Sequence, residues 1–364
     1  MSRHRCAPPV FALLLCAPFF SSQHALAQDG TQAPAPGATS PAAKGKSGHT
    51  GNKDRPLAKA LVKNPVIWED PGPIAGKNLL LGRGGEDHLP RAPFTFVAED
   101  HSGTNPKFDV RDTEGKKWRV KLGQEARPEV AASRLLWAVG FFTDEDYLLP
   151  TATVAGLQIK RGHDLVHGES ISEARFDRKP KGQDKIADWG WKENPFTGTR
   201  EFNGLRVMMA VLNNWDLKDV NNAVYSDEKH DRQLFLVHDI GATFGSNDEH
   251  RTHETDKGNL KSYETSKFIV KNEGGKVTFG TPAFPAKFLF DEGPVLVGEA
   301  FRRSALVWIG HDIPVADARW VGSLLSQLTH EQIEDAFRAG DFPEDQREAF
   351  VKVVEGRISE LKTL

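Results

Sequence analysis

Between residues 94 and 122, apolar and polar positions alternate in three short runs. Alternation with a period of two is typical of strands that bury one face, and turn-forming residues separate the runs. The runs cover residues 94–98, 108–112 and 118–122. The pattern therefore predicts a three-stranded antiparallel meander.

The period then changes to that of a helix. Pro128 suits a first helical turn, apolar residues recur at helical spacing as far as Val139, and Gly140 suits the helix end. After this helix, the pattern predicts two short strands at 147–149 and 156–160. Residues 161–199 are polar and irregular, and we expect no regular element there.

The second half of the chain is mainly of helical type. A strongly apolar helix is expected at 205–212, and helices from about residue 299 onward. Thr329 and Gln332 form a capping-box pattern that opens a helix ending at Gly340. Two runs at 222–225 and 234–237 predict a hairpin, and 246–275 reads as loop. A sheet, one helix and then mostly helices predict an α+β fold.

The N-terminus has the features of a Sec-type secretory signal. Arg3 and Arg5 precede an apolar stretch at 10–20 that is too short to span a bilayer, and a small-residue cleavage site follows at 25–27. We expect residues 1–27 to be removed and the protein to be exported, either to the periplasm or outside the cell. No later stretch is apolar enough to predict a transmembrane segment.

Composition then bounds the mature chain. Both cysteines, Cys6 and Cys16, lie within the signal, so neither a disulfide nor a thiolate metal site is expected. Removing two of the 47 basic residues leaves 45 against 50 acidic ones, a net charge of −5 that argues against a nucleic-acid binder. Residues 28–55, rich in Ala, Pro, Gly and Ser, predict a disordered linker, and 56–93 an irregular N-terminal wrap.

Two polar segments in the second half carry candidate chemistry. Asp216-Leu217-Lys218 is followed by Asn221, which reads D-L-K-x-x-N directly after the apolar helix. Asp239-Ile240-Gly241 reads D-x-G at the end of an apolar run. Phosphoryl transfer from ATP needs an acid that orients the attacking hydroxyl, a cation for the phosphoryl oxygens, and Asn and Asp ligands for metal ions.

Upstream residues add a possible ion pair. Lys121 lies on the third predicted strand, and Glu129 follows eight residues later at the helix start. Glu125 competes for the same lysine, but it precedes Pro128 and is expected in the loop, so Glu129 ranks first.

Together, residues 94–245 resemble the protein-kinase-like superfamily, nearest to its atypical HipA-like and phosphoinositide-kinase-like members. The resemblance implies a two-lobed fold, with a sheet and one helix at 94–165 and a mainly helical lobe at 166–364. It also implies ATP and Mg²⁺ as cofactors and a hydroxyl-bearing acceptor, with protein, lipid and small molecule all open as its class. The implied roles are catalytic acid for Asp216, phosphate contacts for Lys218 and Lys121, pairing with Lys121 for Glu129, and metal ligation for Asn221 and Asp239.

The chain departs from the family pattern in several places. The glycine triad is absent, and the segment from Gly103 to Lys107 stands in its place, where backbone donors and the lysine would meet phosphate. Trp215 stands where the family has the arginine of H-R-D, and no A-P-E motif follows.

Two other functions stay open at this point. The same fold can serve as a pseudokinase or nucleotide-binding interaction module, and an exported compartment, where ATP is scarce, favours that alternative. The His238-Asp239 pair is also typical of metal-dependent phosphohydrolases. The run Arg175, Arg178, Lys179 and Lys181 is expected to be a solvated loop, or else a contact for an acidic substrate.

Overall fold

The computed structural model describes residues 56–101, 105–178, 182–214, 216–245, 257–280 and 305–364. The strands are β1 Pro65–Val66, β2 Phe94–Asp100, β3 Lys107–Arg111, β4 Lys117–Leu122, β5 Asp146–Ala155, β6 Val166–His167, β7 Ser170–Arg178, β8 Lys185–Ala187, β9 Asn222–Asp227, β10 Arg232–Val237, β11 Ile269–Glu273, β12 Lys276–Phe279 and β13 Ile313–Pro314. The α-helices are α1 Ala126–Ala138, α2 Arg200–Val211, α3 Leu260–Thr265, α6 Val315–Leu325, α7 His330–Ala339 and α8 Glu344–Thr363.

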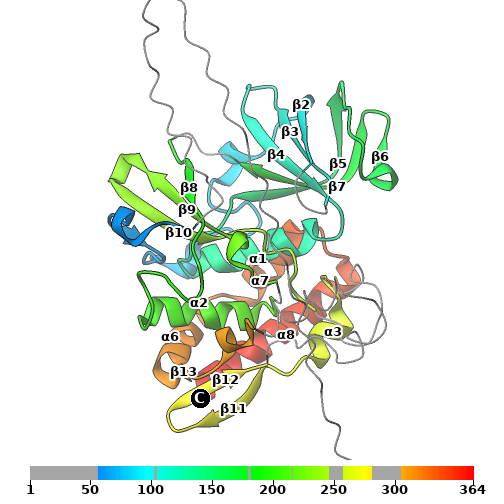
Figure 1. Cartoon of the computed structure of the whole chain (residues 1–364). Coiled ribbons are helices and arrows are strands. Elements are labelled where there is room, and N and C mark those ends of the chain that lie inside the picture. The colour runs from blue at the N-terminus through cyan, green and yellow to red at the C-terminus, as the bar shows by residue number, and fades with distance from the viewer. Residues whose placement is uncertain (1–55, 102–104, 179–181, 215, 246–256, 281–304) are drawn as a thin grey trace, which may run out of the picture. The chain divides into compact units, whose positions relative to one another are not determined.

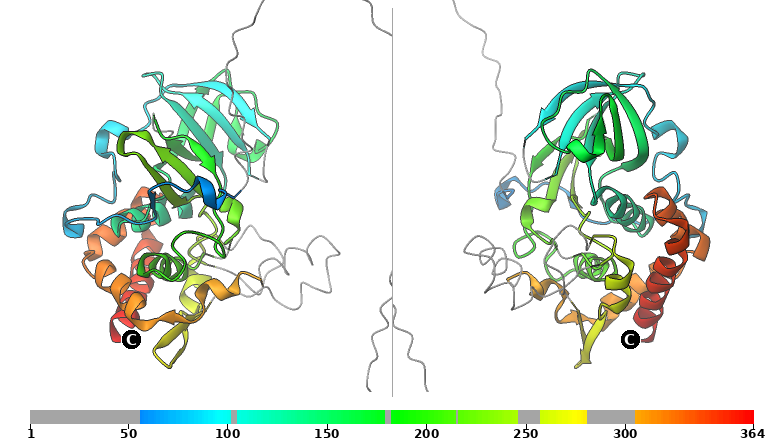
Figure 2. Two further views of the ribbon diagram at one scale, coloured as in Figure 1. Left: turned by 60° about the vertical axis from the view of Figure 1, so that its left-hand side comes forward. Right: turned by 90° about the vertical axis from the view of Figure 1, so that its right-hand side faces the viewer.

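Strands β2 to β7 form the first lobe. Their order is β4-β3-β2-β5-β7-β6, and β4 also pairs with β7, so the sheet closes on itself (Figure 2, right). Inward-facing side chains such as Phe108, Trp118 and Phe176 fill its interior. Because neighbouring strand residues point to opposite faces, Lys121 lies on the other face from Val120.

Helix α1 joins this sheet to the helical lobe. It contacts β5 and β7 on one side and α7 on another, as Figure 1 shows. In the helical lobe, α2 packs on α6, and α8 contacts α3, α6 and α7. The β9–β10 hairpin belongs to a second sheet, ordered β1-β10-β9-β8, and β11, β12 and β13 form a third.

The predicted fold class is confirmed. The chain has a two-lobed α+β arrangement, with an antiparallel-sheet lobe carrying one helix before a mainly helical lobe. The three-strand meander, the helix after it and the hairpin at 222–237 lie where the pattern predicted them. The capping box at Thr329 and Gln332 forms both of its hydrogen bonds, and α7 ends at Gly340.

Other expectations need correction. The stretch 156–160 is not a strand, because Gly156 has φ +70° and ends β5. Residues 161–199 are not irregular throughout, since β6, β7 and β8 lie there. The first sheet therefore continues to Arg178, past the lobe boundary expected at residue 165. Residues 260–273, expected as loop, contain α3 and β11. Within the described residues, the longest helices are too polar to span a membrane.

The contact between α7 and α8 is expected to depend on pH. His330 Nε2 lies 3.0 Å from Glu348 Oε2, and its Nδ1 lies 3.1 Å from Glu355 Oε1. The hydrogen bond to Glu355, with the charge of both carboxylates, raises the pKa of His330. Because the pKa of His330 is higher in the folded protein than in the unfolded chain, protonated His330 stabilises the fold. This stabilisation is complete at pH values below the unfolded-state pKa, near 6.5, and it is lost as the pH rises through the folded-state pKa.

We therefore expect His330→Gln to lower the unfolding midpoint more at pH 5.5 than at pH 8. Thermal unfolding at both pH values checks this, with His167→Gln, at an exposed position of β6, as the control. An equal loss at the two pH values would show that the charged pair contributes nothing.

Candidate active site

Lys121 is the centre of the ion pairs between the lobes. Its side chain is 2% exposed, and its ammonium lies 2.5 Å from Glu125 Oε2 and 3.1 Å from Glu129 Oε2. It also donates a short hydrogen bond to Asp239 Oδ1. The structure thus brings together residues from β4, the start of α1 and the segment after β10.

This environment keeps Lys121 charged. Burial alone would lower the pKa of Lys121, but the charges of Glu129, Asp239 and Glu125 outweigh burial and raise it well above its ordinary value. Burial would likewise raise the pKa of Asp239, yet its attraction to Lys121 holds that pKa well below the usual range. Both groups are therefore ionised at neutral pH.

Glu129 and Glu125 both bind Lys121. Glu129 lies in the first turn of α1, while Glu125 is the residue just before the helix. Glu125 lies before the helix and Glu129 pairs with Lys121, as expected, but Glu125 contacts the same ammonium as well. Each reaches the ammonium because Lys121 projects from β4 toward the beginning of α1.

Sequence reasoning missed the role of Arg175. It is 5% exposed on β7, and its guanidinium lies 3.1 Å from Glu129 Oε1 and 2.8 Å from Asp146 Oδ1. Instead of lying in a solvated loop, Arg175 fixes the far side of Glu129. Its apolar neighbours in sequence, Ala174 and Phe176, were the signal for a strand.

A group of three carboxylates surrounds this arginine. Oxygens of Asp144, Asp146 and Asp177 lie within 4.8 Å of one another. Burial would lower the pKa of Arg175, but these three carboxylates and Glu129 raise it well above its ordinary value. The positive charge of Arg175 balances the negative charge of these carboxylates, so the group belongs to the ion-pair network and needs no metal ion.

The second group of predicted site residues, Asp216, Lys218 and Asn221, lies in the loop after α2. Lys218 Nζ lies 3.0 Å from Asp216 Oδ1, and the Asp216 N–H donates to Asn214 Oδ1 at 3.0 Å. The amide of Asn221 donates to the Asp216 carbonyl at 2.8 Å. These bonds hold the Asp216 backbone from both sides, while its carboxylate stays 20% exposed. Trp215 lies outside the described residues.

Backbone contacts join this loop to Asp239. The His238 N–H donates to the Asn221 carbonyl at 2.9 Å, just where β10 has ended. Asp239 then adopts φ +52°, a left-handed conformation that turns the chain out of the strand direction. Asp216, Asn221 and Asp239 are thus linked in series, and Asp239 in turn contacts Lys121.

Lys107 lies beside the same centre. It opens β3 and pairs in register with Lys121 on β4. Burial lowers the pKa of Lys107, against the attraction of Asp239. The ammonium of Lys107 therefore interacts electrostatically with the carboxylate of Asp239. Gly103 lies outside the described residues.

Asn221 and Asp239 fit Mg²⁺ as ligands. The Asn221 nitrogen is used by the Asp216 carbonyl, so the oxygen of that amide is the end left for a cation. Asp239 is ionised and 41% exposed. An amide oxygen and a carboxylate are ligands that Mg²⁺ accepts when phosphates and water complete its shell.

Gly241 of the D-x-G segment packs tightly on the start of α1. A Cβ on Gly241 would lie 2.5 Å from Glu125 Cβ and 2.8 Å from the Glu125 carbonyl oxygen. We expect Gly241→Ala to lower the free energy of unfolding by about 1–3 kcal/mol, as overpacking does.

Gly356→Ala is the matched control. Nothing lies within 4 Å of a Cβ built at this position in α8, so we expect alanine to raise stability by about 0.5–1 kcal/mol. Urea unfolding of both variants checks the pair. Equal effects at the two glycines would contradict the close contact at Gly241.

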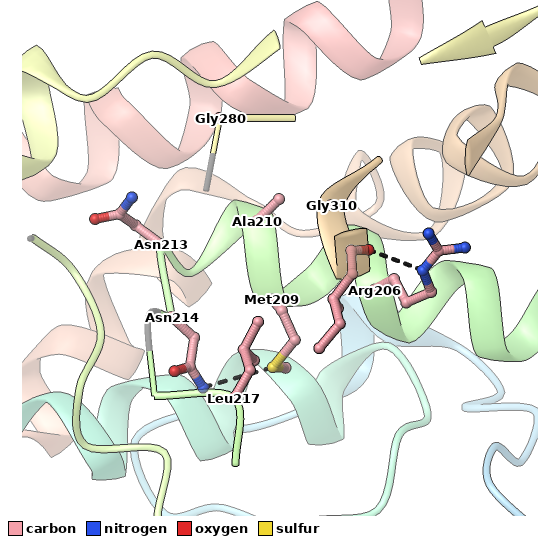
Figure 3. A pocket seen from close by; sticks show the side chains of 9 residues that line it. Arg206, Met209, Ala210, Asn213, Asn214, Leu217, Gly280 and Gly310 are labelled. Carbon is pink, nitrogen blue, oxygen red and sulfur yellow. Dashed lines mark hydrogen bonds between the residues drawn. The ribbon is translucent and has the colours of Figure 1, made fainter. Parts of the chain in front are cut away.

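A small cavity lies beneath the start of the Asp216 loop. It measures about 10 Å³ and is lined by residues of α2 and the loop, including Met209, Asn213 and Asn214. Figure 3 shows the Asn214 amide directed at the Met209 sulfur, a contact of 3.5 Å. The volume suits at most a single water, so this cavity supports the loop and holds no substrate.

The described residues around His238-Asp239 differ from the phosphohydrolase expectation. A phosphohydrolase dyad would lie on a helix, whereas His238 and Asp239 directly follow β10, as the β-like run at 234–237 predicted.

Comparisons with known proteins find similar chains among solved structures alone. No known family model matches the chain, and no curated protein matches it. Among solved structures, it is similar to a proinflammatory kinase of Helicobacter pylori, CtkA, with 13% identity and a TM-score of 0.32. The match covers 73% of this chain and 97% of the Helicobacter chain. The likeness to HipA-like proteins stays a prediction.

Proposed function

We propose that the protein is an ATP-dependent phosphotransferase that moves the γ-phosphoryl group to a hydroxyl acceptor. One observation carries the proposal. Lys121, buried between the lobes, contacts Glu129 on α1 and Asp239 after β10. Phosphoryl transfer in kinase-like folds needs a strand lysine held by a helix glutamate, with a metal-binding aspartate close by.

The catalytic loop supplies the groups for the acceptor. Asp216 orients the hydroxyl and accepts its proton, and the acceptor oxygen forms a bond to the γ-phosphorus. The bond from that phosphorus to the bridging oxygen breaks, and ADP leaves with the electron pair. Lys218, 3.0 Å from Asp216, neutralises charge that develops on the transferred group.

The cleft residues bind the nucleotide. Lys121 and Lys107 contact phosphate oxygens, while Glu129, fixed by Arg175, keeps Lys121 in place. Asn221 and Asp239 would hold Mg²⁺, which would supply positive charge to offset that of the phosphates. We propose only that the acceptor carries a hydroxyl group. No motif in the described residues distinguishes a protein acceptor from a lipid or a small molecule.

Export is proposed on the signal-like N-terminus alone. An exported phosphotransferase must turn over ATP outside the cytoplasm, whereas a pseudokinase there would only have to bind nucleotide. The two functions differ in transfer, not in nucleotide binding.

The test is incubation of the purified chain with γ-labelled ATP, with and without Mg²⁺. We expect ADP formation and incorporation of label into the chain or an added hydroxyl acceptor, both dependent on Mg²⁺. Nucleotide binding without any turnover would support the pseudokinase alternative, and the absence of both would overturn the kinase-like site.

A further inference from the structure

Glu125 gathers donors from three separate segments. Its Oε2 accepts from Lys121 Nζ and from Asn105 Nδ2, each at 2.5 Å. Its Oε1 accepts a short hydrogen bond from Lys257 Nζ. The carboxylate is only 12% exposed, so these contacts are shielded from bulk water. Three donors that converge on anionic oxygens are also what a phosphate group requires.

Lys257 is held in place by its backbone neighbour. The Gly258 N–H donates to the Thr243 carbonyl at 2.9 Å, and Gly258 has φ +66°. Thr243 is fully buried, and its hydroxyl donates to the Pro128 carbonyl at 3.4 Å. The chain beside Lys257 is therefore attached both to the D-x-G segment and to α1, and the lysine side chain is 17% exposed.

The contact between Glu125 and Lys257 lies next to the residues that bind nucleotide in the proposed function. Gly241 lies against Glu125, and Lys121 contacts Asp239 as well as Glu125. Asn105 lies two residues before Lys107, at the beginning of β3. Two ammonium groups, from Lys121 and Lys257, therefore share one carboxylate at the edge of the phosphate-binding region.

Resting on the proposed nucleotide-binding function, we propose that Lys257 is a further phosphate-binding residue, and that Glu125 is the positioning residue that holds it beside Lys121. In the absence of nucleotide, the ammonium of Lys257 donates its hydrogen bond to the carboxylate of Glu125. When ATP binds, Lys257 donates to a phosphate oxygen while Glu125 keeps the side chain at that edge of the site.

The charge state of Glu125 agrees with this role. Burial alone would raise the pKa of Glu125, but the charges of Lys121 and Lys257 outweigh burial and lower it. Glu125 is therefore ionised at neutral pH and is an anionic acceptor for both lysines. Sequence reasoning missed Lys257 because it lies in a polar stretch without a motif, and its partner is 132 residues away.

A double-mutant cycle on Mg²⁺–ATP affinity tests the proposal. We expect Lys257→Gln to weaken binding by about tenfold, within the range for one charge-assisted hydrogen bond. In a Glu125→Gln background, the same lysine substitution is expected to change affinity by less than about threefold, because Lys257 is no longer held. Calorimetric titration of the four proteins measures this coupling, which a merely structural role for Glu125 would not produce.

Glu173→Gln is the matched control. It makes the same change near the start of α1, at a side chain that is 38% exposed and paired with Arg127 at 3.4 Å. We expect its affinity to equal that of the unchanged protein. Thermal unfolding of each variant checks that it is folded. If Glu125→Gln does not fold, the affinity of Lys257→Gln for Mg²⁺–ATP, compared with that of the unchanged protein, tests the role of Lys257.

The outcomes separate the two proposals. When the unchanged protein binds Mg²⁺–ATP and Lys257→Gln binds equally well, the role of Lys257 is overturned and the proposed function stands. Additive effects of the two substitutions overturn the positioning role of Glu125. When the unchanged protein binds no Mg²⁺–ATP, the proposed function fails, and this inference fails with it.

Discussion

Asp216→Asn is expected to abolish phosphoryl transfer while nucleotide affinity stays unchanged. The substitution removes the carboxylate that, in the proposed function, accepts the hydroxyl proton, and we expect the transfer rate to fall by about 100- to 10,000-fold. Affinity is retained because the described contacts of Asp216 are with Asn214, Lys218 and Asn221, and none is with Lys121 or Asp239. Label transfer from ATP and calorimetric titration measure the two quantities.

Asp231→Asn is the control for this experiment. Asp231 lies in the β9–β10 turn, is 72% exposed and pairs with Lys63. We expect transfer at the rate of the unchanged protein. Loss of both transfer and binding in a folded Asp216→Asn protein would give Asp216 a structural role in place of a catalytic one.

Lys121→Met is expected to lower the free energy of unfolding by about 3–5 kcal/mol. The substitution removes the cation shared by Glu125, Glu129 and Asp239, and an uncompensated buried charge costs this much. Lowering the pH should recover part of the loss, because protonated carboxyls no longer repel one another. Denaturant unfolding at pH 7 and pH 5 checks both expectations.

Lys117→Met provides a comparison on the same strand. Its ammonium lies 2.7 Å from Asp109 Oδ2, but its side chain is 46% exposed, so we expect a loss of about 1 kcal/mol or less. Equal losses at Lys117 and Lys121 would show that the buried network between the lobes contributes no special stability.

Local patterns predicted the elements whose periodicity is unbroken. The alternation at 118–122 predicted β4 and placed Lys121 opposite the apolar face, and the spacing to Glu129 predicted their contact. The three-residue interval from Thr329 to Gln332 was sufficient for a capping box, because that motif depends on residues within one turn.

Apart from residues 147–149, the pair β5–β7 was missed because its alternation changes phase. On β5, Tyr147 and Leu149 belong to the apolar interior before Pro150, whereas Ala152 and Val154 do so after it. Glu173 with φ +48° marks the matching change on β7. A proline and a parity change within one strand hide the period on which sequence reasoning depends.

Residue partners that are distant in sequence set a second limit. The motifs predicted which residue types gather at the site, but they did not predict that Arg175 binds Glu129 or that Lys257 binds Glu125. A charged residue in a polar stretch has the same local signal whether it meets water or a buried carboxylate. Only the folded chain distinguishes the two.

Mg²⁺-dependent binding of ATP tests the central claim most directly. Thermal unfolding of the unchanged protein is expected to shift upward with ATP and Mg²⁺ together, because a ligand that binds only the folded state stabilises it. In Asp239→Ala, we expect Mg²⁺ to add nothing to any stabilisation by ATP. An unchanged protein that ATP and Mg²⁺ do not stabilise, or an Asp239→Ala protein stabilised as strongly as the unchanged one, would contradict it.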